Sequence, residues 1–284
     1  MTNTKILMLT ILCLFNFYPL TSYPQENSKN TKKITTNYNE LDYKEGIIPF
    51  TNSENSIDLG MGKVPVMDTG PYYSTTFLST LGALNAKLNL IKMIDVQCTQ
   101  TLLNMLTNND FYRWNDSPSF ILQALKEYGI VIDKNSACSH KIRIDQYLKI
   151  SNKKYSDLIS FEYSEKSDLN SIKAALKNGI RAIIETALSN DSGNPISVNG
   201  YNLKMNGKPK IYNGGLYACQ QPESSISYCS NQNAAISLIV IGYDDNQQLL
   251  KLRNSWGSDA GENGNYYMTY SFFKAMAGEQ VILK

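Results

Sequence analysis

The stretch NSWGSDAGENG, residues 254–264, lies between two short apolar runs near the end of the chain. The runs at 249–254 and 265–269 have the length and composition of β-strands, and a third run at 235–243 is also largely apolar. Glycine and asparagine are frequent in the stretch itself, which is typical of a connection between strands. We therefore predict that the last part of the chain forms a sheet.

Toward the N-terminus, the same strand-like character continues back to about residue 150. An amphipathic helix is predicted at 168–178, and Gly179 leads from it into an apolar strand at 180–186. A polar insertion rich in glycine and asparagine follows at 189–209. Apart from that helix, the region from residue 151 onward is predicted to be mainly β-structure.

The region before residue 150 has helical periodicity instead. Residues 74–93 place apolar side chains at spacings of one, three and four, which predicts a buried helix. Two more helices are predicted at 99–106 and 118–128, and Gly129 is a natural stop for the second. The predicted fold class is therefore α+β. The apolar positions of the first helix are Phe77, Leu78, Leu81, Leu84, Leu88 and Ile91.

The first 55 residues are expected to lie outside the folded domains. Lys5 precedes an apolar run, so residues 1–22 are predicted to be a cleaved signal peptide and the protein to be secreted. The run is shorter than the roughly 20 residues that span a bilayer, so no membrane anchor is expected after cleavage. Residues 23–55 are rich in Asn, Lys, Thr and Ser, and we interpret them as a polar leader or linker.

Charge and composition exclude several classes of function. Lys and Arg number 27 against 25 Asp and Glu, and this balanced charge argues against nucleic acid as a partner. The single histidine, His140, excludes metal sites built from several imidazoles, and no metal or other cofactor is expected. Of five cysteines, Cys13 lies in the predicted signal, and the remaining four suit two disulfides in an oxidising compartment. Four buried thiols are the alternative.

Several segments agree, in order and spacing, with a single family of proteins. They are VPVMDTG at 64–70, STLGAL at 79–84, QTLL at 100–103, YNGGLY at 212–217, the strand at 235–243, and NSWG with GENG within 254–264. Together these segments resemble the papain-like cysteine peptidases, and the NSWG stretch is the most specific of them.

The resemblance implies a papain-like two-domain fold with a cleft between the domains. The helical left domain would cover residues 56–150, and a β-barrel-like right domain would cover residues 151–284. In the family, the nucleophile stands at the N-terminus of the central helix, which in this chain is the helix predicted at 74–93.

At the positions that the resemblance marks as catalytic, this chain has other residues. The family's cysteine falls on Thr75, its histidine on Ile236 and its oxyanion-hole glutamine on Thr69. Acyl transfer by this mechanism needs a nucleophile activated by a base and a donor aimed at the oxyanion. Only Asn254 matches its counterpart in the family, the catalytic asparagine. Because this chain has no imidazole there for Asn254 to orient, we expect it to have a structural role beside Trp256 at the end of the strand.

The same resemblance suggests where a ligand would bind and how the cysteines pair. The candidates for contacts in the cleft are Tyr72, Tyr73, Ser74 and Trp256. The two tyrosines replace a cysteine and a glycine of the family, so they either pack as ordinary core aromatics or fill the cleft. The suggested disulfides are Cys98 with Cys138 in the left domain and Cys219 with Cys229 in the right domain.

Three functions are consistent with these observations. The first is a secreted, catalytically inactive papain-like protein that binds a peptide or protein through the cleft or the insertion. The second is a hydrolase that uses Ser74 or Thr75 in a non-standard site. The resemblance places His140, the single histidine, too far from these hydroxyls to act as their base. The third is a structural or carrier protein that uses only the fold. The oligomeric state stays open.

Overall fold

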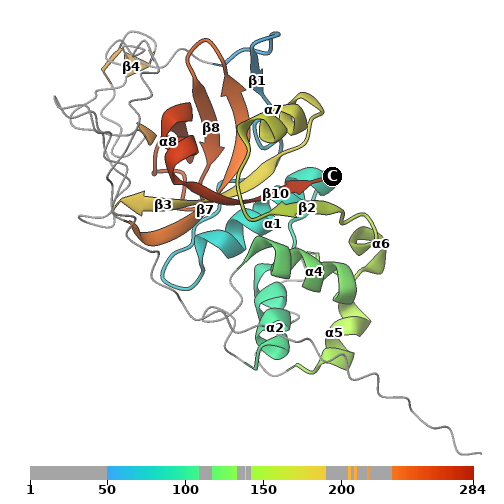
Figure 1. Ribbon diagram of the computed structural model, residues 1–284. Helices are drawn as coiled ribbons and strands as arrows, with labels where there is room; N and C mark the ends of the chain where they lie inside the picture. Colours follow the sequence, from blue (N-terminus) through green and yellow to red (C-terminus); the bar gives the residue numbers. More distant parts are fainter. Residues whose placement is uncertain are drawn as a thin grey trace, which may run out of the picture. The chain divides into compact units, whose positions relative to one another are not determined.

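A computed structural model of the chain describes residues 50–108, 117–132, 138, 142–189, 204–205, 208–209, 216–217 and 232–284. All of these residues belong to one unit, Leu41–Lys284. Helices dominate the first half and a largely antiparallel sheet the second (Figure 1). The predicted α+β class is therefore confirmed. The predicted signal peptide and most of the predicted leader lie outside the described residues.

The three long helices predicted for the first half are present. The helix at 118–128 has the predicted bounds, whereas the first ends early because Asn89 adopts a left-handed backbone with φ of 47°. The second begins early because the Asp95 carboxylate accepts a hydrogen bond from the N–H of Cys98. The helices are α1 (Thr75–Leu88), α2 (Val96–Leu106), α4 (Pro118–Tyr128), α5 (Ile144–Ile150), α6 (Lys153–Ser156), α7 (Leu169–Lys177) and α8 (Tyr270–Met276).

Eight of the described strands form one sheet, and two form a small separate ladder. The order across the sheet is β2-β10-β3-β7-β8-β9-β6, and β1 pairs with the far end of β7. This path is open, so the described strands do not close into the barrel-like form that we expected. The strands are β1 (Ser56–Asp58), β2 (Phe161–Ser164), β3 (Ala182–Ser189), β4 (Lys204–Met205), β5 (Lys208–Pro209), β6 (Leu216–Tyr217), β7 (Gln232–Asp244), β8 (Leu249–Arg253), β9 (Asn265–Thr269) and β10 (Ala277–Leu283).

Helix α1 is buried because other elements cover it on both sides. It packs against β7 on one side and against α4 on the other (Figure 1). Phe77, Leu81 and Leu84 are fully buried in a core that also contains side chains of α2, α4 and β7. The apolar periodicity read from the sequence therefore corresponds to a helix with little exposed surface in its N-terminal three turns.

The opposite face of the sheet has its own core. Helices α7 and α8 cover it, and Ile172, Phe272 and Phe273 are buried there against side chains of β3, β7 and β8. Strand β7 therefore contributes to both cores. Its odd-numbered residues from 237 to 241 face α1, and its even-numbered residues from 236 to 240 face α7 and α8.

The segment that leads into α1 is fixed to the sheet through β1. Gly242 allows this close approach, because a Cβ there would lie 2.5 Å from the carbonyl oxygen of Ile57. Lys251 pairs with Asp58 at 2.6 Å, which holds the end of β1 over the sheet. The chain is thus directed toward the start of α1 from a defined point.

In the parts of the chain that the structure describes, no helix combines the length and the apolar character that crossing a membrane requires.

Candidate functional site

The N-terminus of α1 is the feature around which the candidate site is built. Ser74 is the N-cap, and its hydroxyl accepts a hydrogen bond from the N–H of Phe77 at 3.0 Å. Thr75 is the first helical residue and is half-buried. The first N–H groups of a helix have no partner within the helix, so this end favours an acceptor or an anion.

A cluster of hydroxyls joins this helix end to β7. The Thr75 hydroxyl accepts from the N–H of Ser237 at 3.3 Å. The hydroxyls of Thr76 and Ser237 lie 2.9 Å apart, and the Ser79 hydroxyl donates to the Ser237 carbonyl at 2.8 Å. Three side chains of α1 therefore converge on one residue of β7, and the Thr75 hydroxyl is held against the strand that carries Ile236.

Ile236 itself lies in an apolar environment. Its side chain is 6% exposed and belongs to the core that faces α7 and α8, together with Leu238 and Val240. Its neighbour Ala235 is exposed. The burial that strand alternation predicts for Ile236 is therefore observed.

Asn254 lies directly after β8 and is also buried, with 2% of its surface exposed. Its Oδ1 accepts a hydrogen bond from the N–H of Trp256 at 2.7 Å, which is the structural contact that we expected beside Trp256. Among the residues that the structure describes, its Nδ2 has no hydrogen-bond partner. Only the oxygen of this side-chain amide is therefore hydrogen-bonded. A buried amide N–H without an acceptor lowers the stability of the fold.

The loop before α1 is tied to the same region. The N–H of Thr69 donates to the carbonyl of Ser255 at 2.8 Å, and the N–H of Gly257 donates to the carbonyl of Met67 at 2.9 Å. Asp68 and Trp256 form an isolated antiparallel bridge. Thr69 is therefore held beside the segment that follows Asn254.

The two tyrosines of this loop differ in their environment. Tyr72 is 75% exposed, whereas the ring of Tyr73 stacks on Phe77 with centroids 5.8 Å apart. Tyr73 packs as an ordinary core aromatic, and Tyr72 points outward and does not fill a cleft. The Trp256 ring meets Tyr266 edge-on at 5.7 Å and stays partly accessible. An exposed tyrosine and a partly exposed tryptophan thus flank the N-terminus of α1.

Comparison with known proteins identifies this architecture. No family model and no curated protein matches the sequence. The fold is similar to that of xylellain, a cysteine protease from Xylella fastidiosa, with a TM-score of 0.56 and 17% identity over 85% of this chain and 96% of that one. It is also similar to digestive procathepsin L 3 of Tenebrio molitor larval midgut, with a TM-score of 0.50 and 17% identity over 82% of this chain and 72% of that one.

The chain has the papain-like fold. The resemblance read from its motifs is therefore confirmed at the level of the fold. In this papain-like fold, α1 packs against β7, and the hydroxyl of Thr75 contacts the N–H of Ser237. The side chain of Ile236 lies on the other face of β7, toward α7 and α8.

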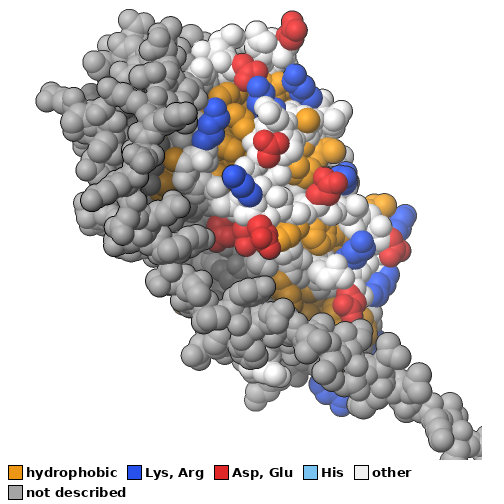
Figure 2. All heavy atoms as spheres, in the orientation of Figure 1, with side chains coloured by type: hydrophobic (Ala, Val, Ile, Leu, Met, Phe, Trp, Pro, Cys, Tyr) orange, Lys and Arg blue, Asp and Glu red, His pale blue; other side chains and the backbone are white. Residues whose placement is uncertain are grey.

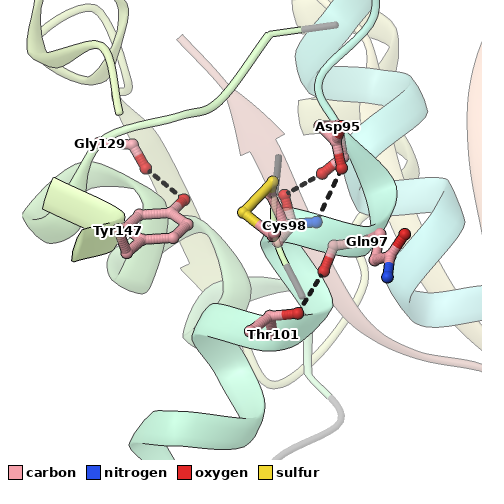
Figure 3. Close-up of a disulfide and its surroundings, with 8 residues drawn as sticks. Asp95, Gln97, Cys98, Thr101, Gly129 and Tyr147 are labelled. Carbon is pink, nitrogen blue, oxygen red and sulfur yellow. Dashed lines mark hydrogen bonds between the residues drawn. A yellow bond between two sulfur atoms is a disulfide. The ribbon is translucent and has the colours of Figure 1, made fainter. Parts of the chain in front are cut away.

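One of the two suggested disulfides is present in this papain-like structure (Figure 3). Cys98 near the start of α2 is bonded to Cys138, and both residues are fully buried. Close by, the hydroxyl of buried Tyr147 donates to the carbonyl of Gly129, and burial raises the pKa of that phenol. The suggested partners Cys219 and Cys229 lie outside the described residues.

Other predicted features bear less on the site. His140 lies outside the described residues, as does most of the insertion at 189–209. Across the described ranges, no group of three or more His, Cys, Asp and Glu side chains could hold a metal ion.

Sequence reasoning did not single out the hydroxyl cluster. Ser237 is a lone hydroxyl in an otherwise apolar run, and Thr76 and Ser79 lie three residues apart on one helix face. That combination of a polar residue in a buried strand and hydroxyls at helical spacing is the signal that could have revealed it.

Proposed function

We propose that the mature protein is a secreted, non-catalytic relative of the papain-like cysteine proteases that binds a peptide or protein partner. The binding face would comprise the N-terminus of α1, the exposed ring of Tyr72 and the accessible edge of Trp256. Aromatic side chains that are partly exposed beside a helix N-terminus are suited to bind an extended peptide.

The main support for the proposal is the side-chain amide of Asn254, whose oxygen is hydrogen-bonded and whose nitrogen is not. In the family, this asparagine orients the catalytic imidazole, and here the corresponding position is the buried Ile236. An isoleucine offers no hydrogen bond, which is consistent with an Asn254 Nδ2 that has no partner. We infer that the site has kept the asparagine and lost the group with which it worked.

The environment of Thr75 supports the same conclusion. Its hydroxyl accepts from a backbone N–H, and the neighbouring Thr76 hydroxyl lies against that of Ser237. A hydroxyl becomes a nucleophile when an adjacent base removes its proton, and none of these contacting groups titrates near neutral pH. The alternative of a hydrolase that uses Ser74 or Thr75 is therefore disfavoured.

The proposed secretion rests on two observations. The N-terminal sequence has the pattern of a signal peptide, and the disulfide between Cys98 and Cys138 suits an oxidising compartment.

The purified mature protein is expected to be inactive toward peptides. Fluorogenic peptide substrates should be hydrolysed no faster than in buffer, whereas a typical enzyme turns over about 10 times per second. Epoxide reagents directed at thiols and fluorophosphonate reagents directed at hydroxyls should leave its mass unchanged. Turnover that disappears in Thr75→Ala would contradict the proposal and support the hydrolase.

Peptides selected from a random displayed library against the mature protein are expected to bind at the proposed face. Because Tyr72 is the most exposed aromatic side chain there, Tyr72→Ala should weaken the selected peptides about tenfold or more in fluorescence anisotropy. The matched control is Ile91→Ala, which removes an exposed side chain beyond the other end of α1. Equal losses in both variants, or a library that yields no binder, would argue for the structural or carrier role.

A further inference from the structure

Asp68 and Trp256 are cross-strand partners at the proposed binding face. They form an isolated antiparallel bridge, which is flanked on its two sides by the backbone hydrogen bonds of Thr69 and of Gly257. This pattern makes them a non-hydrogen-bonded pair, in which the Cα atoms lie about 4.5 Å apart and both side chains stand on the same side of the backbone. The carboxylate of Asp68 and the indole of Trp256 therefore project next to each other.

The carboxylate of Asp68 is exposed and is held in one orientation. Its Oδ1 accepts a hydrogen bond from the N–H of Gly70 at 2.9 Å. Its Oδ2 lies beside Gly257, where a Cβ would come within 3.3 Å of this oxygen. Within the described ranges, no Lys or Arg forms an ion pair with Asp68. The Oδ2 is therefore available to a donor from another molecule.

The indole of Trp256 offers such a donor a π-face. The side chain is partly accessible, and its ring meets that of Tyr266 at 88°. A perpendicular contact of this kind occupies at most one face of the indole. A planar guanidinium can stack on an indole while its N–H groups donate to a carboxylate, whereas the ammonium of lysine is a point charge on a flexible stem. The pair of Asp68 and Trp256 is therefore better suited to arginine than to lysine.

The two segments that form the face are acidic. Residues 64–86 contain one carboxylate, that of Asp68, residues 254–264 contain two, and neither segment contains Lys or Arg. One of the two is that of Asp259, which is exposed and lies three residues beyond Trp256. Over the described part of the face in Figure 2, Lys and Arg side chains lie among the Asp and Glu side chains. The segments around Asp68 instead favour a cationic partner.

Two positive groups lie near these segments. Arg253 directly precedes the second of them, but it is half-buried and its Nε donates to the Oδ1 of Asn265 at 2.9 Å. The N-terminus of α1 has a partial positive charge, which falls off within the first turn and is capped by Ser74. Neither group is paired with Asp68, so the charge of this carboxylate is not neutralised within the described residues.

We propose that the peptide bound at this face presents an arginine side chain to Asp68 and Trp256. The guanidinium stacks on the indole and donates to the Oδ2 of Asp68. This inference rests on the proposed function, because it specifies the kind of peptide that the same face binds.

The composition of selected peptides is the first test. Peptides selected from the random displayed library against the mature protein should contain arginine more often than the unselected library does. Peptides that lose affinity in Tyr72→Ala but show no enrichment in arginine would overturn this inference and leave the proposed function standing. A library that yields no binder would overturn both.

Asp68→Asn tests the contact directly. The variant keeps an Oδ1 that can accept from Gly70 and removes only the charge. It should weaken an arginine-containing selected peptide by about fivefold in fluorescence anisotropy. It should not weaken the same peptide with citrulline in place of arginine, because citrulline has the shape of arginine without its charge. Equal losses for the two peptides would contradict a direct contact.

A second group of carboxylates provides the matched control. Tyr163 is 43% exposed, hydrogen-bonds to Glu279 and interacts electrostatically with Glu165 and Glu185. An arginine peptide that recognised only negative charge beside an aromatic ring would bind there as well. Glu279→Gln should therefore leave the affinity of the selected peptide unchanged. If this variant weakens the peptide as much as Asp68→Asn does, the peptide does not distinguish the two surfaces, and the proposal is wrong.

Discussion

Replacing Ile236 by Asp is expected to destabilise the fold by at least about 3 kcal/mol. The side chain is 6% exposed and is packed among Leu238 and the other apolar residues that face α7 and α8. A carboxylate there loses its hydration and gains no charged partner among these apolar side chains. Thermal unfolding followed by circular dichroism should show Tm lowered by roughly 6–12 °C.

The matched control is Ala235→Asp, which introduces the same charge at the exposed neighbouring position. That variant should stay within about 0.5 kcal/mol of the parent. If Ile236→Asp also melts within a degree or two of the parent, Ile236 is exposed. The assignment of this position to the missing histidine would then have to be replaced by a different alignment.

Removing the disulfide is expected to have a comparable effect. Cys98 and Cys138 are 40 residues apart in the sequence, and cross-linking a loop of that length stabilises a fold by about 4 kcal/mol through the unfolded state. The double variant Cys98→Ala with Cys138→Ala should therefore lose about that free energy of unfolding in a urea titration. Because both residues are fully buried, the lost sulfur atoms add a packing cost.

Reductant provides the control for this experiment. The parent unfolded in the presence of dithiothreitol should approach the stability of the double variant, whereas the double variant should not respond to the reagent. A double variant within about 1 kcal/mol of the oxidised parent would show that the bond contributes little to stability.

The sequence predicted best those elements whose start and stop signals are local. Helix α4 was located correctly because Ser117, Pro118 and Gly129 mark its ends with a cap, a first-turn proline and a glycine stop. Strand β9 was likewise bounded by turn residues on its N-terminal side. Where a cap was overlooked, as with Asp95 before α2, the predicted bound was wrong by three residues.

Elements without a strong local pattern were missed. Strand β2, with the sequence FEYS, alternates too briefly to be recognised, and it exists because β10 pairs with it. Helices α5 and α8 have seven residues each and are stabilised by the packing of Tyr147, Phe272 and Phe273. For such short segments, tertiary contacts decide the conformation, and periodicity carries little information.

For the candidate site, the sequence predicted which elements come together but not the contacts between their side chains. The motifs place Thr75, Ile236 and Asn254 in one region, and the structure brings the elements that carry them together. The orientation of Tyr72 and the hydroxyl cluster on Ser237 were not predictable, because both depend on how a loop and a helix approach β7.

The position of β7 between two cores has a consequence for cooperativity. Ser237, Ile239 and Ile241 face the helical half, and Ile236, Leu238 and Val240 face the strand-rich half. Unfolding either half would expose one whole side of this strand to water, and a slip of one residue would exchange the two sets of side chains. The two halves are thus coupled into one energetic unit. The change from mainly helices to mainly strands near residue 150 therefore does not split unfolding into two separate transitions.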